Sequence, residues 1–240
     1  MRRVPPVLVV GQSHAEALLS ALRGVDEPDV EVANLNARDR ELKVAEKIRM
    51  EGYLPSGRDR KLVASMIGGN FYNTFGLIEN VVRFDFAEPG ETDFEADPDR
   101  QLISYMLMKH YFSDVMNRGF LGSIRFLRAH YGSCKFLHVC SPPPISDNEH
   151  IAAHPGGVFR DKLHLGVAPS RLRRKLYDLH TLVICEFCQK EGVEMLPPPP
   201  QAITEDRFLA RPYWKQDPTH ANNAYGKLVL DQLRGKLETC

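Results

Sequence analysis

Short apolar runs alternate with helix-like segments along the whole chain. Five runs rich in valine, leucine and isoleucine are predicted to be buried strands, at residues 5–11, 30–36, 62–67, 135–140 and 193–196. Between runs, apolar residues recur three and four positions apart, as in Ala15, Leu18, Leu19 and Leu22, which predicts helices with one buried face. Strands that alternate with helices form a parallel sheet covered on both faces. We therefore expect an α/β fold, with three α/β/α layers around a five-stranded parallel sheet, and a single domain over residues 1–240.

The segments between the strands differ in character. Long helices are predicted at residues 102–127, with an interruption near Gly119, at 170–192, and from Pro218 onward. Loops are predicted at 85–99, where acidic residues dominate, and at 145–168. The basic cluster of Arg171, Arg173, Arg174 and Lys175 is expected to be a solvated helix end, with a handle for an anionic substrate as the alternative.

Polar side chains follow two of the predicted strands and recur near the C-terminus. The first strand ends in Gly11-Gln12-Ser13-His14, and the third ends in Gly68-Gly69-Asn70. A serine hydroxyl needs a base, a carboxylate that orients the base, and donors for the oxyanion. Asp217-Pro218-Thr219-His220 places a carboxylate and an imidazole three residues apart, close enough to interact if this segment turns. Because ligands bind beyond the carboxyl ends of parallel strands, Ser13 and Asn70 are expected at one edge of the sheet.

These blocks, in this order, resemble those of the SGNH (GDSL-type) hydrolase superfamily. The resemblance implies a flavodoxin-like arrangement of the sheet and an acyl-serine mechanism. It implies that Ser13 is the nucleophile, that His220 is the general base and then the general acid, and that Asp217 orients the His220 ring. It also assigns the oxyanion hole to the Ser13 backbone N–H and the Asn70 side-chain amide.

The match departs from the family in two of its blocks. Gln12 stands where the first block has an acid. The second block normally supplies a glycine N–H to the oxyanion hole, yet no glycine lies between Gly24 and Gly52. Ala37 or Asn36, just past the second strand, is the candidate for that donor.

Structural alternatives exist for each site residue. Ser13 suits the cap of the first helix, and Asn70 suits a turn after two glycines. Asp217 before a proline is typical of a helix N-cap, but this role leaves His220 unexplained. Phe71 stands where an aspartate commonly follows the asparagine of the third block. This departure weakens the match and leaves the Asn70 side-chain amide in place.

Composition limits the partners. Thirty-one basic and thirty-one acidic residues among 240 give no overall field that would attract nucleic acid or an anionic membrane. A small-molecule or glycan ester is the expected partner, and Phe71 and Trp214 are predicted to pack against its sugar or acyl group. The odd number of cysteines, five, fits reduced thiols. Cys185 and Cys188 have no second ligand pair, so neither a metal nor a cofactor is expected. The N-terminal apolar run is too short for a signal peptide or a membrane span, which favours a cytoplasmic protein.

These observations favour a serine esterase that removes a short acyl group, such as acetate, from a carbohydrate or small molecule. Acyl transfer to an alcohol uses the same acyl-enzyme and stays open as an alternative. An α/β-hydrolase is disfavoured, because its nucleophile elbow follows several strands rather than the first. A non-catalytic SGNH-like binding protein is the third possibility.

Overall fold

The computed structural model describes residues 3–26, 28–36, 43–49 and 52–238, and it contains the predicted sheet. The strands are β1 (Val7–Gly11), β2 (Val30–Asn34), β3 (Leu62–Met66), β6 (Lys135–Val139) and β7 (Glu194–Leu196). All pair in parallel, in the order β2-β1-β3-β6-β7. The shorter strands β4 (Phe84–Asp85) and β5 (Gln101–Leu102) pair with each other in a separate ribbon. The predicted three-layer α/β fold is confirmed.

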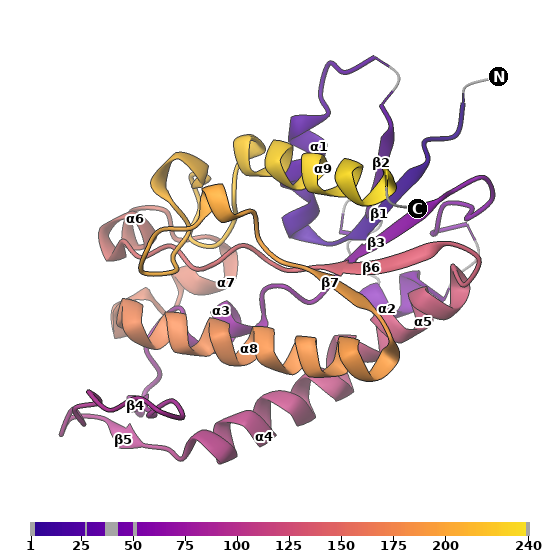
Figure 1. Ribbon diagram of the computed structural model, residues 1–240. Coiled ribbons are helices and arrows are strands. Elements are labelled where there is room, and N and C mark those ends of the chain that lie inside the picture. The colour runs from indigo at the N-terminus through magenta and orange to yellow at the C-terminus, as the bar shows by residue number, and fades with distance from the viewer. Residues whose placement is uncertain (1–2, 27, 37–42, 50–51, 239–240) are drawn as a thin grey trace.

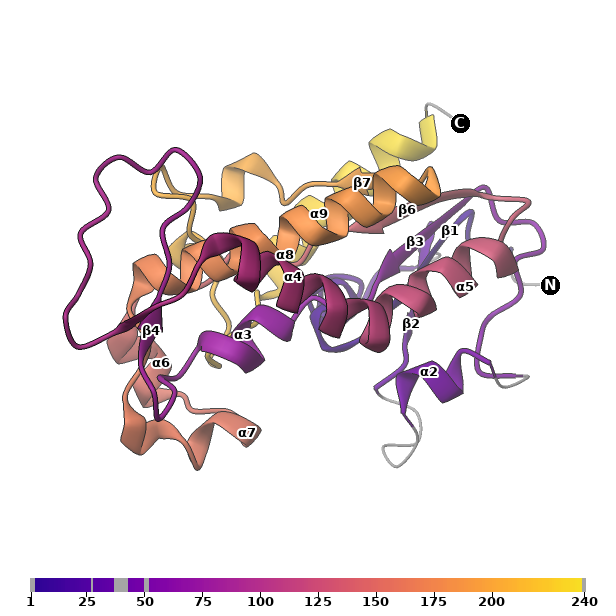
Figure 2. The same ribbon diagram turned by 90° about the horizontal axis from the view of Figure 1, so that it is seen from below.

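Helices cover both faces of the sheet (Figure 1). The helices α1 (Glu16–Ala21) and α9 (Asn223–Glu238) pack on one face, against the side chains of Val7 and Val9. The other face carries α2 (Val44–Lys47), α3 (Phe71–Gly76), α4 (Tyr105–Met116), α5 (Gly122–His130) and α8 (Ser170–Glu191). Figure 2 shows α8, α4 and α5 running across this face. Successive side chains of a strand point to opposite faces of the sheet. Because helices cover both faces, β1 is buried along its whole length, which explains its unbroken apolar run.

The strand register brings several chain segments to one edge of the sheet. Gly11 at the end of β1 lies beside Asn34 of β2 and beside Met66 of β3. The chain therefore leaves the three strands at the same level, just before Gln12, Leu35 and Ile67. This edge is where ligands bind in sheets of this kind.

Two of the predicted segments differ in the structure, and a predicted helix interruption is confirmed. Residues 145–168, expected as a loop, contain α6 (Asn148–Ala153), α7 (Gly157–Arg160) and a 3₁₀ turn (Leu163–Leu165). The interruption expected near Gly119 is a π-helical segment (Asn117–Leu121) between α4 and α5. The last helix begins at Asn223 rather than Pro218, because the Asn222 side chain accepts hydrogen bonds from the N–H groups of Ala224 and Tyr225 and so caps it. Two further 3₁₀ turns lie at Pro200–Ala202 and Arg211–Tyr213.

The basic cluster at the start of α8 is not a uniformly solvated helix end. Arg173 is 1% exposed, and its guanidinium donates to the carbonyl oxygens of Ile145, Ser146 and Ala168. Lys175 is also buried, and its ammonium group donates to the carbonyl oxygen of Phe86 at 2.6 Å. These buried cations hold long connections against α8, which the local sequence pattern did not reveal. Within the described residues, no helix combines the length and the apolar character that crossing a bilayer requires.

The contact between α1 and α9 leads to a stability prediction. A Cβ added at Gly226 would lie 2.1 Å from the carbonyl oxygen of Ala17, a backbone atom. Gly226→Ala is therefore expected to lower the free energy of unfolding by about 1–3 kcal/mol through overpacking. Gly235 lies in the same helix with open space around it, so Gly235→Ala should raise the free energy by about 0.5–1 kcal/mol. Urea denaturation of both variants checks the pair, and equal effects would contradict it.

Candidate active site

Ser13 lies at the turn that joins β1 to α1. It opens a 3₁₀ turn (Ser13–Ala15), so its backbone N–H has no acceptor within that turn. The turn is tight: a Cβ added at Gly11 would lie 2.8 Å from the Cβ of Ala15. Ser13 is half-buried and lines a cavity of about 230 Å³. The other lining residues are Gln12, His14, Asn36, Gly68, Gly69, Asn70, Phe71, Thr74 and Phe120.

Asn70 reaches the same cavity from the end of β3. It precedes the first residue of α3, after a sharp turn in which Gly68 has a φ of 81°, a conformation that favours glycine. The Asn70 Oδ1 accepts a hydrogen bond from the Asn73 side-chain amide at 2.9 Å. The Asn70 amino group makes no hydrogen bond to any described residue, so it is available to a ligand in the cavity.

Gln12, the departure from the family's first block, joins the ends of two strands. Its Oε1 accepts a hydrogen bond from the backbone N–H of Gly68 at 2.7 Å. The side chain thereby holds the turn that carries Asn70 against the turn that carries Ser13. Position 12 stands out in the sequence only as a mismatch, because nothing local identifies Gly68 as its partner.

Asp217 and His220 form a hydrogen-bonded pair in the turn before α9. The His220 Nδ1 lies 3.0 Å and 3.1 Å from the two carboxylate oxygens of Asp217. The Asp217 Oδ1 also accepts from the backbone N–H groups of Thr219 at 2.9 Å and His220 at 2.7 Å. Burial raises the pKa of the Asp217 carboxyl, but the His220 ring and these backbone donors outweigh it and hold the pKa well below its usual range. The carboxylate is thus ionised and fixes the ring so that Nδ1 faces it.

A second histidine packs against this pair. His14 follows Ser13 directly, and the ring centroids of His14 and His220 are 4.8 Å apart. His14 is 4% exposed, and burial together with the neighbouring His220 lowers its pKa to about 3. Its ring is therefore neutral at pH 7. Only the tertiary structure reveals this contact between His14 and the Asp217–His220 pair.

The hydrogen bond expected between nucleophile and base is not formed in this structure. Among the described residues, the Ser13 hydroxyl has no hydrogen-bond partner, and the buried His220 Nε2 has none either. His220 does not line the cavity, whereas Ser13 and His14 do. Catalytic hydrogen bonds are often long before substrate binds and tighten in the complex. The two atoms that an acyl-serine mechanism would join are thus both unpaired.

The donor expected after β2 is only partly observable. Ala37 lies outside the described residues. Asn36 lines the cavity, but its backbone N–H donates to the Asn34 side-chain oxygen at 3.0 Å. The alternative in which the Asn36 N–H serves the oxyanion is therefore not supported in this conformation.

The two aromatic residues expected to bind substrate lie in different places. Phe71 lines the cavity, together with Phe120 from the π-helical segment. Phe120 packs tightly on Gly68, where an added Cβ would lie 2.1 Å from its ring. Trp214 does not line this cavity; its Nε1 donates to the Leu209 carbonyl oxygen at 2.7 Å. A role for Trp214 in substrate binding stays a prediction.

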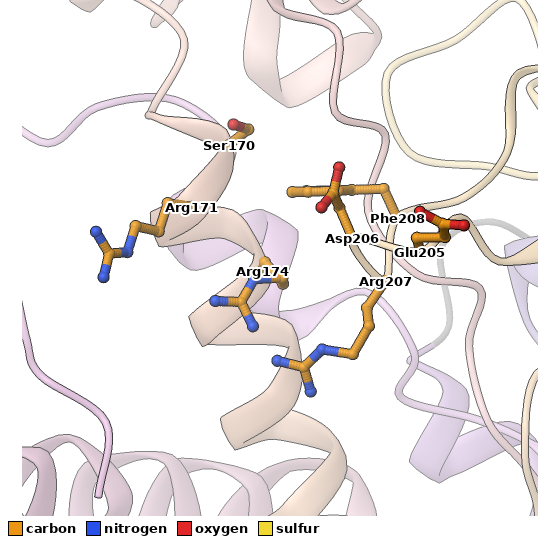
Figure 3. A pocket seen from close by; sticks show the side chains of 7 residues that line it. All are labelled: Ser170, Arg171, Arg174, Glu205, Asp206, Arg207 and Phe208. Atoms are coloured by element: carbon orange, nitrogen blue, oxygen red, sulfur yellow. The ribbon is translucent and has the colours of Figure 1, made fainter. Parts of the chain in front are cut away.

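A larger surface hollow of about 350 Å³ lies at the start of α8 and lacks this chemistry (Figure 3). Its arginines are already paired with carboxylates: Arg171 with Glu91, and Arg174 and Arg207 with Asp178. Ser170 lines the hollow, but no histidine does. The smaller cavity at Ser13 is therefore the candidate active site.

The geometry at Asn70 leads to a prediction about activity. Asn70→Ala should lower kcat for an ester substrate by roughly 10²–10³-fold, the usual cost of one oxyanion donor. The substitution also removes the acceptor of the Asn73 side chain in α3, so urea denaturation must verify that the variant is folded; the helix itself loses no N-cap bond. Steady-state kinetics with a nitrophenyl ester check this, with Asn80→Ala in the exposed segment after α3 as the control. An unchanged kcat would rule out Asn70 as a donor.

Several solved structures resemble this chain over nearly its whole length. No protein-family model matches the sequence, and no curated protein matches it. Among solved structures, a GDSL-like lipase from Bacteroides thetaiotaomicron is similar with a TM-score of 0.52 and 12% identity, over 100% of this chain and 92% of the other. Phospholipase A1 from Streptomyces albidoflavus is similar with a TM-score of 0.53 and 12% identity, over 96% and 98%. The lipopolysaccharide acetyltransferase periplasmic domain of Salmonella ser. Paratyphi A is similar with a TM-score of 0.51 and 11% identity, over 99% and 85%. At these identities the likeness shows a shared fold.

Proposed function

The chain has the SGNH hydrolase fold, and we propose that it is a serine esterase that hydrolyses a short acyl ester through an acyl-serine intermediate. One observation carries this proposal. Asp217 binds the Nδ1 side of the His220 ring, the Nε2 side has no partner among the described residues, and the ring packs on the residue that follows Ser13. A packing role for Asp217 and His220 would not require this arrangement.

In the proposed reaction, the Ser13 Oγ attacks the ester carbonyl carbon while its proton passes to the His220 Nε2. The carbonyl electron pair moves onto oxygen, where the Ser13 backbone N–H and the Asn70 amide donate to the resulting oxyanion. When the intermediate collapses, the alcohol leaves with the proton from Nε2. Water then repeats the sequence at the acyl-serine, with His220 as base, and releases the acid. Asp217 stays ionised throughout and stabilises the imidazolium.

The size of the cavity favours a small acyl group. Its volume of about 230 Å³ is below the roughly 300–1,000 Å³ of pockets that enclose drug-sized ligands. Phe71 and Phe120 supply an apolar wall, and polar groups come from residues that include Gln12, Ser13 and Asn70. We propose a short acyl chain such as acetyl, carried by a small-molecule or glycan alcohol.

Acyl transfer is the alternative at the same serine. One of the similar structures is a domain of an acetyltransferase, and transfer differs from hydrolysis only in whether an alcohol or water attacks the acyl-serine. Adding a sugar alcohol to an ester assay separates the two outcomes. Formation of an acylated sugar at the expense of free acid would favour the transferase.

Intact mass after incubation with a fluorophosphonate, together with release of nitrophenol from nitrophenyl acetate, tests the proposal. A serine hydrolase should take up one phosphonate per chain and turn over the acetate ester faster than the octanoate ester. A folded sample that shows neither labelling nor turnover would leave a non-catalytic binding protein on this fold.

A further inference from the structure

Three carboxamide side chains line the Ser13 cavity, those of Gln12, Asn36 and Asn70, and two of them are anchored through their oxygen atoms. Asn70 and Gln12 both use their oxygen atoms inside the protein, to accept from the Asn73 side chain and from the Gly68 backbone, respectively. Within the described part of the chain, neither amino group has a hydrogen-bond partner. The cavity therefore has two NH₂ groups that are held in place through their amide oxygens and are not used inside the described part of the protein.

The orientation of the Gln12 amide follows from its partner. A backbone N–H can only donate, so the atom that meets the Gly68 N–H at 2.7 Å must be the Gln12 oxygen. The amino group is then the other limb of the planar amide. Gly68 is itself held in place, since its φ of 81° suits glycine and the Phe120 ring fills the space where a Cβ would stand. The Gln12 amide is thus fixed before any ligand binds.

We propose that the Gln12 Nε2 is an additional hydrogen-bond donor to the oxyanion formed at Ser13, beside the Ser13 N–H and the Asn70 amide. This inference rests on the proposed esterase function. An ionised acid at position 12 has no hydrogen to donate and would repel the oxyanion, whereas a carboxamide is neutral and donates. The Asn36 backbone N–H is already bound to the Asn34 side chain, and the exposed Asn36 side chain has no anchoring hydrogen bond to a described residue. The Gln12 amide, in contrast, is held in place by Gly68.

Two substitutions separate the donor from the other roles of Gln12. Gln12→Glu keeps an oxygen that accepts from Gly68 and removes the donor, but it adds a charge. Gln12→Met keeps the length and the neutrality, and it removes both the donor and the acceptor. If Gln12 donates to the oxyanion, both variants should lower kcat for nitrophenyl acetate by roughly 10²–10³-fold, with KM changed less than about threefold, since the bond strengthens in the transition state.

The other outcomes each overturn the inference. If only the Glu variant loses activity, the added charge is responsible; if only the Met variant does, Gln12 acts solely by holding Gly68. Full activity of both variants excludes any role. Gln101→Glu, at an exposed position in β5, controls for the charge change, and urea denaturation verifies that each variant is folded. An inactive, unlabelled wild type would sink the esterase proposal itself, whereas an active wild type with one of these patterns would sink only the role of Gln12.

Discussion

Ser13→Ala is expected to lower kcat for nitrophenyl acetate by roughly 10⁴–10⁶-fold and to abolish fluorophosphonate labelling. Removing the nucleophile of an acyl-serine mechanism costs about as much as removing the whole catalytic group, because the remaining members have nothing to activate. The fold should be unaffected, since the Ser13 hydroxyl makes no hydrogen bond to the described residues. Initial-rate kinetics and intact mass measure the two effects.

Ser170 provides a matched control. It also opens a helix and lines a surface hollow, but no histidine lines that hollow (Figure 3). Ser170→Ala should keep the activity and the label of the wild type. Ser13 would be excluded as the nucleophile if Ser13→Ala retained a tenth or more of the wild-type rate. It would also be excluded if Ser170→Ala, rather than Ser13→Ala, lost the fluorophosphonate label.

Acidification is expected to destabilise the protein steeply below about pH 6.5. Burial is the main cause that lowers the pKa of His14 and His180 to about 3 and that of His138 to about 4. In the unfolded chain these rings titrate near pH 6.5. Between about pH 6.5 and pH 4 the unfolded state therefore binds more protons than the native state, so the free energy of unfolding falls as the pH falls. In this range each histidine lowers the free energy of unfolding by about 1.4 kcal/mol for each pH unit of acidification, and the three together lower it by about 4 kcal/mol per pH unit.

Urea denaturation at pH 7, 6 and 5 measures this loss. His180 lies among the rings of Phe71, Tyr72 and Phe120, and neither of its nitrogens has a hydrogen-bond partner among the described residues. His180→Phe should therefore fold. It should reduce the change of the free energy of unfolding with pH by the share of one titrating histidine, about 1.4 kcal/mol per pH unit. His110 is exposed, and His110→Gln should leave the slope unchanged. A free energy of unfolding that is flat from pH 7 to pH 5 would contradict burial of the three neutral rings.

The sequence alone determined the sheet and the level at which its polar residues emerge. A strand buried on both faces is almost entirely apolar, so β1, and β3 apart from Ser65, could be recognised without knowledge of their neighbours. Ser13 and Asn70 follow these strands directly, and parallel pairing brings both to one edge. The contact between Asp217 and His220 was also predictable, because three residues of chain in a turn suffice to form it.

The tertiary structure decided what surrounds those residues. Gln12 meets Gly68, His14 meets His220, and Phe120 packs on Gly68, all across long stretches of chain. Arg173 is buried because carbonyl groups of distant connections accept its hydrogen bonds. A local pattern shows which face of an element is apolar, but it does not identify the partner on the other side. The packing of helices on the sheet selects that partner, and so it determined which amides are left to donate in the cavity and which histidines are kept neutral.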